Sequence, residues 1–148
     1  MLSLQYPPNN FRLRESEGKR QIFDAHRKKW VVFTPEEWVR QNFLQYLLQI
    51  KNYPASLIAV EKELKLGELS KRFDILVYNR RHEPWMMIEC KAMEVPLTES
   101  VLQQLLRYNL SIPVTYLVIT NGTGTFVFER ISGRLEALAD IPGWAGKE

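Results

Sequence analysis

The chain has 148 residues, 45% of them hydrophobic and 25% charged, so it is long enough to bury a sizeable core. Its aromatic content of 11% argues against disorder, and a net charge of +3 permits a nucleic-acid partner without requiring one. A single cysteine excludes an internal disulfide framework and a cysteine-rich zinc site.

No apolar run approaches the roughly 20 residues of a membrane-spanning helix. The N-terminus lacks the basic start and the long apolar stretch of a signal peptide. We therefore expect one cytoplasmic domain over residues 1–148 that does not contact a membrane.

The first 33 residues predict an arm and a β-hairpin. Residues 1–10 end in prolines and asparagines and are expected to be loose, and two alternating segments, 11–14 and 21–24, flank a turn. A basic run at 26–29 precedes an apolar stretch at 30–33. That run is either a solvated surface or a patch that contacts phosphates.

A helix is predicted from Thr34 to about Ile50. Thr34 is a good N-cap and the following proline suits the first helical position. The apolar positions at helical spacing form one inward stripe, made of Val39, Phe43, Tyr46, Leu47 and Ile50. Glu36 falls on this stripe, so we expect it to point toward the sheet, whereas Glu37 completes a capping box.

Three strands are predicted next, over 57–66, 71–78 and 85–93. Short connections imply that they pair antiparallel. In the second strand, alternation places Phe73, Ile75 and Val77 on one face. Asp74 then lies on the other face, as an acid within an otherwise apolar strand.

The remainder predicts a second helix between Pro96 and Pro113, a buried strand at 114–120 and a returning strand at 125–129. The order is α-β-β-β-α-β, an α/β class with an extra N-terminal hairpin. We divide the chain into an arm and hairpin (1–33), a core (34–130) and a tail (131–148), in which one aromatic residue packs.

Glu89 and Lys91 interrupt the most apolar strand. Because strand side chains alternate, both project from one face and Cys90 from the other, where it fills the core. Burying a carboxylate or an ammonium group costs several kcal/mol unless the group is paired or binds a metal. Two further Glu-x-Lys triplets, Glu17-Gly18-Lys19 and Glu63-Leu64-Lys65, have no apolar flanks and are interpreted as a turn and a solvated face.

Phosphodiester hydrolysis needs charge neutralisation at the phosphate and a nucleophilic water. Carboxylates on adjacent strands, Asp74 and Glu89, are suitable oxygen ligands for Mg²⁺ or Mn²⁺, and the Cys90 carbonyl can add another. Lys91 is then placed to position the water or stabilise the developing charge. The alternative is a buried carboxylate–lysine network that only satisfies itself.

Asp74 followed by Glu89-Cys90-Lys91 resembles the PD-(D/E)XK nuclease signature, with Phe73 in place of the usual proline. The segments 34–41, 72–77, 88–92 and 116–122 resemble, more closely, the N-terminal nuclease domain of type I restriction enzyme R subunits. The resemblance implies a restriction-endonuclease-like fold with a mixed central sheet, Asp74 and Glu89 as metal ligands, and Lys91 as the catalytic lysine.

It also implies an accessory pair on the second helix, Gln104 and Tyr108, where Gln104 contacts the phosphate or the metal-bound water. Tyr108 is either packing or a nucleic-acid contact, and Glu36 matches an assisting acid in the first helix. Phosphate contacts are expected from a set of basic residues: Lys28, Lys29, Arg72, Arg80 and Arg81, together with Arg27 and Lys71.

The expected function is that of a magnesium-dependent DNA endonuclease, related to restriction or repair. The chain has no phosphate-binding loop, so it is not itself a helicase. The expected partners are DNA and either a second copy of the chain or a separate helicase or specificity subunit. Two alternatives stay open: an inactive nucleic-acid-binding or assembly module of the same fold, and an RNA substrate.

Overall fold

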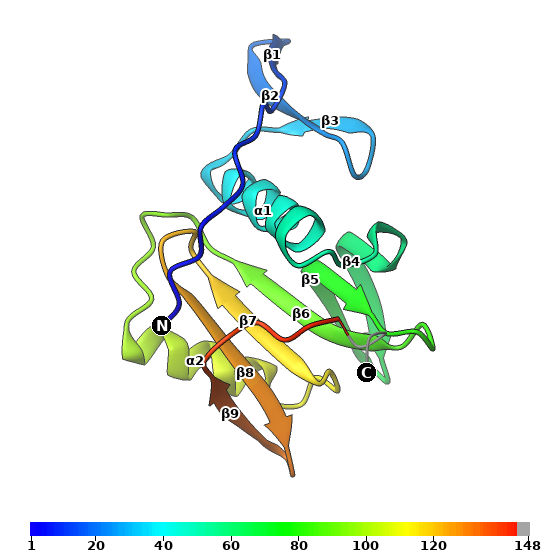
Figure 1. Ribbon diagram of the computed structural model, residues 1–148, viewed down its shortest axis with the longest axis vertical. Coiled ribbons are helices and arrows are strands. Elements are labelled where there is room, and N and C mark those ends of the chain that lie inside the picture. The colour runs from blue at the N-terminus through cyan, green and yellow to red at the C-terminus, as the bar shows by residue number, and fades with distance from the viewer. Residues whose placement is uncertain (145–148) are drawn as a thin grey trace.

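A computed structural model describes residues 1–144 and contains two helices and two β-sheets (Figure 1). A small sheet lies on one side of helix α1, Pro35–Gln45, and a large sheet lies on the other. Helix α1 is therefore covered by a sheet on both sides, which decides which of its side chains are buried.

The small sheet is antiparallel and consists of β1 (Leu13–Ser16), β2 (Lys19–Asp24) and β3 (Lys29–Val32). The predicted hairpin is thus confirmed, and the apolar stretch after the basic run adds a third strand. Ile22 and Asp24 on β2 are fully buried, because this face of the sheet packs toward α1.

Helix α1 begins as predicted, since the Thr34 hydroxyl accepts a hydrogen bond from the Glu37 amide at 3.0 Å. The helix becomes a π-helical turn at Tyr46–Ile50, and Ile50 is 49% exposed, so its place on the inward stripe was wrong. The two glutamates differ from the predicted pattern in their exposure, although Glu36 lies near enough to the large sheet for its charge to raise the pKa of Asp74. Glu36 is exposed, whereas Glu37 is 4% exposed, because the small sheet covers a second side of the helix.

The large sheet has the strand order β4-β5-β6-β7-β8-β9. Its strands are β4 (Ile58–Leu66), β5 (Leu69–Tyr78), β6 (Pro84–Cys90), β7 (Tyr116–Thr120), β8 (Thr125–Ile131) and β9 (Arg134–Leu138). Only β6 and β7 pair in parallel, and helix α2, Glu99–Asn109, forms the crossover between them. The predicted α-β-β-β-α-β order and the mixed sheet are confirmed.

Two hydrophobic clusters cover the two faces of this sheet. Val39 and Phe43 of α1 and Leu47 of the π-helical turn belong to one cluster, and Leu102, Leu105 and Leu106 of α2 pack against the other. Cys90 belongs to the α1 cluster and is buried, as predicted.

Strict alternation fails in β5. Phe73 packs with Leu76 in the α2 cluster, whereas Ile75 and Val77 belong to the α1 cluster, so the predicted grouping of Phe73 with the latter two was wrong. Glu61, on the neighbouring strand, has a φ of 51°, and the β4–β5 ladder omits the position where Glu61 would pair with Asp74. The local break in the ladder lets the strand change faces.

The chain ends contact the large sheet. The first residues are more ordered than predicted, because Leu2 forms an antiparallel bridge with Thr125. Strand β9 lies within the range predicted as a tail and extends the sheet. The expected packed aromatic is Trp144, whose indole nitrogen donates to the Tyr78 carbonyl at 3.0 Å. Within residues 1–144, neither helix is long and apolar enough to cross a membrane.

Candidate active site

Asp74 and Glu89 lie close together on the neighbouring strands β5 and β6. The last pair in the register of these strands is Ile75 with Ile88, and Asp74 and Glu89 are the next residue on each strand. They are near enough for the charge of Glu89 to raise the pKa of Asp74. An Asp74 carboxylate oxygen, Oδ2, accepts a hydrogen bond from the Cys90 amide at 2.8 Å. This contact replaces a backbone bond of the ladder and holds the Asp74 carboxylate beside the end of β6.

The Asp74 carboxylate carries charge that its surroundings do not fully balance. Burial raises the pKa of Asp74 above its usual value, and the negative charges of Glu89 and Glu36 add to this rise, against the Cys90 amide and Arg40. A raised pKa means that the folded protein favours the neutral form of this group. A bound cation would remove that penalty.

This raised pKa predicts that Asp74→Asn stabilises the fold. A carboxyl whose pKa is raised by folding binds its proton more tightly in the folded state, so its contribution to stability falls as pH rises from the unfolded pKa, about 4, through the folded pKa. Asparagine imitates the neutral form at every pH. The midpoint of urea unfolding should therefore be higher for Asp74→Asn than for the wild type at pH 7.

The difference should disappear below about pH 4, where the wild-type carboxyl is protonated in both states. Glu63→Gln, on the exposed part of β4, is the control and should leave the midpoint unchanged. A lower midpoint for Asp74→Asn at pH 7 would contradict the charge imbalance.

Lys71 is the lysine that contacts Glu89. Its Nζ lies 2.7 Å from Glu89 Oε1, and the Lys71 side chain is only 10% exposed. The same Nζ lies 5.0 Å from the centre of the Tyr108 ring, so helix α2 reaches this pair. The sequence predicted Lys71 as one of several phosphate contacts, and in the structure this lysine is buried and paired with Glu89.

Two further predicted catalytic residues lie after β6 and on α2. Lys91 is half-buried and comes directly after β6. The strand was predicted to end at Met93 and ends three residues earlier, at Cys90. The Lys91 amide donates a hydrogen bond to the Thr120 carbonyl at 2.8 Å. Gln104 is exposed on α2, one turn before Tyr108, which is 70% exposed. Burial raises the pKa of the Cys90 thiol well above its usual value, which fits packing and not nucleophilic chemistry.

The structure brings few of the predicted phosphate contacts to this centre. Arg72 is exposed and pairs with Glu61 at 2.6 Å. Lys28 and Lys29 are exposed at the start of β3, in the small sheet. Arg80 and Arg81 lie in the turn after β5, and the four strand steps from Asp74 to Tyr78 alone span about 13 Å.

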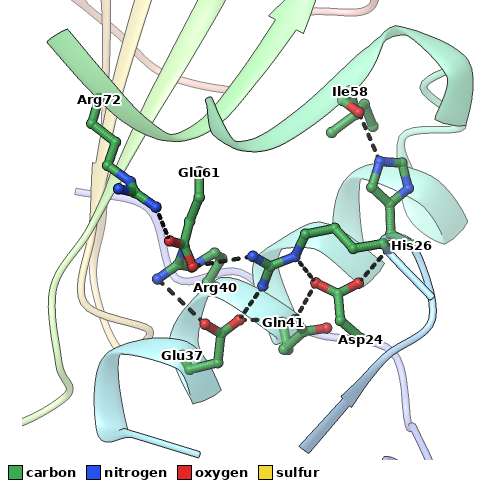
Figure 2. A network of polar contacts seen from close by, with 9 residues as sticks. Asp24, His26, Glu37, Arg40, Gln41, Ile58, Glu61 and Arg72 are labelled. Carbon is green, nitrogen blue, oxygen red and sulfur yellow. Dashed lines mark hydrogen bonds and ion pairs between the residues drawn. The ribbon is translucent and has the colours of Figure 1, made fainter. Parts of the chain in front are cut away.

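A buried network of charges connects the small sheet, α1 and β4, and the sequence did not predict it (Figure 2). Arg27 contacts three carboxylates: Asp24 at 2.5 Å, Glu61 at 3.1 Å and Glu37 at 3.3 Å. Gln41 donates to both Asp24 and Glu37. The Glu37 side chain is therefore held by contacts with Arg27 and Gln41, in addition to its place in the first turn of α1.

Arg40 links this network to the candidate site. Its guanidinium lies 2.9 Å from Glu61 and 3.4 Å from Glu37, and its charge opposes the raised pKa of Asp74. The only sequence signal for these contacts is helical spacing, since Glu37, Arg40 and Gln41 share one side of α1. Their partners Arg27 and Glu61 are distant in sequence and give no local signal.

The donor atoms present suit a hard divalent cation. Asp74 and Glu89 supply carboxylate oxygens on adjacent strands, and burial, with a smaller contribution from the charge of Glu89, raises the pKa of Asp74. Among residues 1–144 no group of three or more Asp, Glu, His or Cys side chains has metal-binding geometry. A metal here would therefore take its further ligands from the backbone, water or substrate.

Residues 35–142, well over half of the chain, match the family described as "Type I restriction enzyme R protein N terminus (HSDR_N)". No curated protein matches the chain. The match includes both helices, the large sheet and the Asp74–Glu89 pair, and it begins after the small sheet. The fold, with its mixed sheet between two helices, is restriction-endonuclease-like.

Proposed function

The chain belongs to the type I restriction enzyme R protein N-terminal family, and from this premise we propose that it is a metal-dependent DNA endonuclease whose catalytic residues are Asp74, Glu89 and Lys91. The observation that carries the proposal is the pair of opposed carboxylates on β5 and β6, one of which has a raised pKa. Perturbed acids at the end of a central strand are typical of functional sites.

The metal ligands would be Asp74, Glu89 and the Cys90 carbonyl. Mg²⁺ or Mn²⁺ held there would neutralise charge on the scissile phosphate and lower the pKa of a bound water. The amide of Cys90 fixes Asp74 in place before any ligand arrives, and the short bond from Lys71 fixes Glu89. Both carboxylates are therefore held in position before a metal ion binds.

Lys91 is the proposed catalytic lysine. Its backbone is anchored to β7, so the side chain starts from a fixed point one residue after β6. Its ammonium group would donate to a phosphate oxygen and stabilise the charge that develops during hydrolysis. Gln104, on the exposed side of α2, would orient the phosphate, and Glu36 would assist from the N-terminus of α1.

The Lys71–Glu89 pair favours a second candidate function. A lysine that already neutralises one of the two carboxylates is also what a self-satisfied ion pair in an inactive binding or assembly module would contain. The two functions differ in one measurement. An inactive module would not nick plasmid DNA in Mg²⁺ or Mn²⁺, whereas the proposed nuclease would.

Lys91→Ala is expected to reduce metal-dependent plasmid nicking by about 10²-fold, because one charged donor to the transition state is lost. Metal affinity should be retained, since the ligand atoms of Asp74 and Glu89 remain. Nicking would be followed by agarose gels in Mg²⁺ and in EDTA, and metal affinity by calorimetry.

Lys65→Ala is the matched control. Lys65 ends the Glu63-Leu64-Lys65 triplet, which has the same spacing but lies exposed on β4. This variant should nick like the wild type. Equal nicking by Lys91→Ala and the wild type would exclude Lys91 from the chemistry.

Partners are part of the proposal. We propose DNA as the substrate and either a second copy of the chain or a separate helicase or specificity subunit as the protein partner, as the family description of a restriction enzyme subunit supports. A substrate of single-stranded or duplex RNA in the same assay is the remaining alternative, and competition with plasmid DNA separates the two.

A further inference from the structure

The small sheet presents one face to solvent that carries only positive charge. In the strand register Gln21 pairs with Arg14 on one side and with Val32 on the other, so these three residues lie next to one another on this face. Arg12 lies beside Phe23, whose amide donates a hydrogen bond to the Arg12 carbonyl, and Phe23 pairs with Trp30. Lys19 lies on the same face, two residues before Gln21. The acids within these strands, Glu15 and Asp24, alternate to the opposite face.

The guanidinium groups of the two arginines on this face lie over aromatic rings. The Arg14 guanidinium carbon lies 4.3 Å from the centre of the Trp30 ring, and that of Arg12 lies 4.9 Å from Phe23 and 5.3 Å from Trp30. Arg14 also donates from Nε to the Gln21 side chain at 2.7 Å. A guanidinium stacked in this way keeps its outer N–H groups in water and pays little entropy to donate them.

We infer that this face, defined by Arg12, Arg14, Lys19 and Gln21 over Phe23 and Trp30, binds the phosphate backbone of duplex DNA. The inference rests on the proposed function for the choice of DNA. The positive charge of this face complements a polyanion. Its cations lie in a row, and the acidic residues of the same strands lie on the opposite face of the sheet.

A duplex fits this surface better than a single strand. The ring faces of Phe23 and Trp30, on which an unpaired base would stack, are already covered by arginine. What remains available is N–H donors, which suit phosphate oxygens. Helix α1 lies between the small sheet and the large sheet (Figure 1). Asp74 and Glu89 belong to β5 and β6 of the large sheet, so the face of the small sheet would anchor DNA while the large sheet carries the chemistry.

The test is fluorescence anisotropy with a labelled DNA duplex of about two helical turns, in EDTA so that cleavage does not contribute. Arg12→Ala/Arg14→Ala should weaken binding about tenfold at low salt and lower the slope of log K against log salt by about two, one for each lost phosphate contact. Arg12→Lys/Arg14→Lys keeps both charges and should recover most of the affinity.

The control is Lys65→Ala/Arg134→Ala, which removes two exposed cations from β4 and β9, the edge strands of the large sheet. It should bind within twofold of the wild type. Three results with the variants would overturn the inference: the Arg12/Arg14 alanine variant binds like the wild type, the control variant weakens binding equally, or the lysine variant has a wild-type unfolding midpoint and recovers no affinity. Tighter binding of a single strand of equal length than of the duplex would also overturn it.

Failure here is distinguishable from failure of the nuclease proposal. Binding without metal reports on the small sheet, whereas metal-dependent nicking at saturating DNA reports on Asp74, Glu89 and Lys91. The alanine variant should nick at the wild-type rate once DNA is saturating, because its change lies across α1 from the site.

Discussion

Replacing Asp74 by alanine is expected to reduce metal-dependent nicking of plasmid DNA by about 10³-fold or more, to the level seen in EDTA. Asp74 is one of the two carboxylates proposed to hold the metal, and its loss leaves Glu89 as the only side-chain ligand. Glu89→Gln should fall to the same level, because a metal held by one carboxylate is weakly bound and poorly positioned.

Two controls accompany this prediction. Glu63→Gln alters a glutamate in the same Glu-x-Lys spacing on the exposed part of β4 and should nick normally. A double variant, Asp74→Ala/Glu89→Gln, should be no worse than either single variant, because the two residues act as one ligand set. Substantial nicking by Asp74→Ala would place the chemistry elsewhere.

The second large effect concerns stability. Asp24→Asn is expected to lower the free energy of unfolding by about 3 kcal/mol at pH 7. Asp24 is fully buried and receives hydrogen bonds from the Arg27 amide, the Arg27 guanidinium and Gln41. Asparagine leaves buried Arg27 without its nearest charge partner, and removing one member of a buried pair costs more than the pair contributes.

The pH dependence follows from the same contacts. Burial raises the pKa of Asp24, but the bonds from Arg27 and Gln41 outweigh it and hold the pKa below its usual value. A lowered pKa contributes stability that is present above the unfolded pKa, about 4, and is lost as pH falls through the folded pKa. The wild type should therefore lose stability in that acid range, and Asp24→Asn should lose less.

Urea unfolding from pH 2 to 7 measures both effects. Glu136→Gln is the control, since the Glu136–Arg134 pair is exposed and 3.5 Å long, and it should change the free energy of unfolding by less than about 0.5 kcal/mol. A change of that size for Asp24→Asn would show that the network does not stabilise the fold.

The sequence predicted the parts of the fold that depend on local pattern. Apolar runs identified β4, β5 and β6, and short connections made their pairing antiparallel. Since Asp74 and Glu89 lie on neighbouring antiparallel strands, these two steps were enough to bring them together. Buried flanks also separated Glu89 from Glu63, which is exposed in the structure.

Two features were missed because they depend on contact between segments distant in sequence. The sequence indicated one inward stripe on α1, but the small sheet covers a second side of this helix, and that side carries Glu37, Arg40 and Gln41. Lys71 was expected among the phosphate contacts, and no local signal indicated its pairing with Glu89. Its burial comes from Glu89, 18 residues later, and from α2 beyond that.

The central claim is that Asp74 and Glu89 together bind a divalent cation. Titration of Mg²⁺ or Mn²⁺ into the wild type, Asp74→Ala and Glu89→Gln by calorimetry, with Glu63→Gln as the control, tests it most directly. We predict binding by the wild type and the control, and loss of binding in both site variants. A wild type that binds neither metal, or site variants that bind as well as the wild type, would contradict the claim.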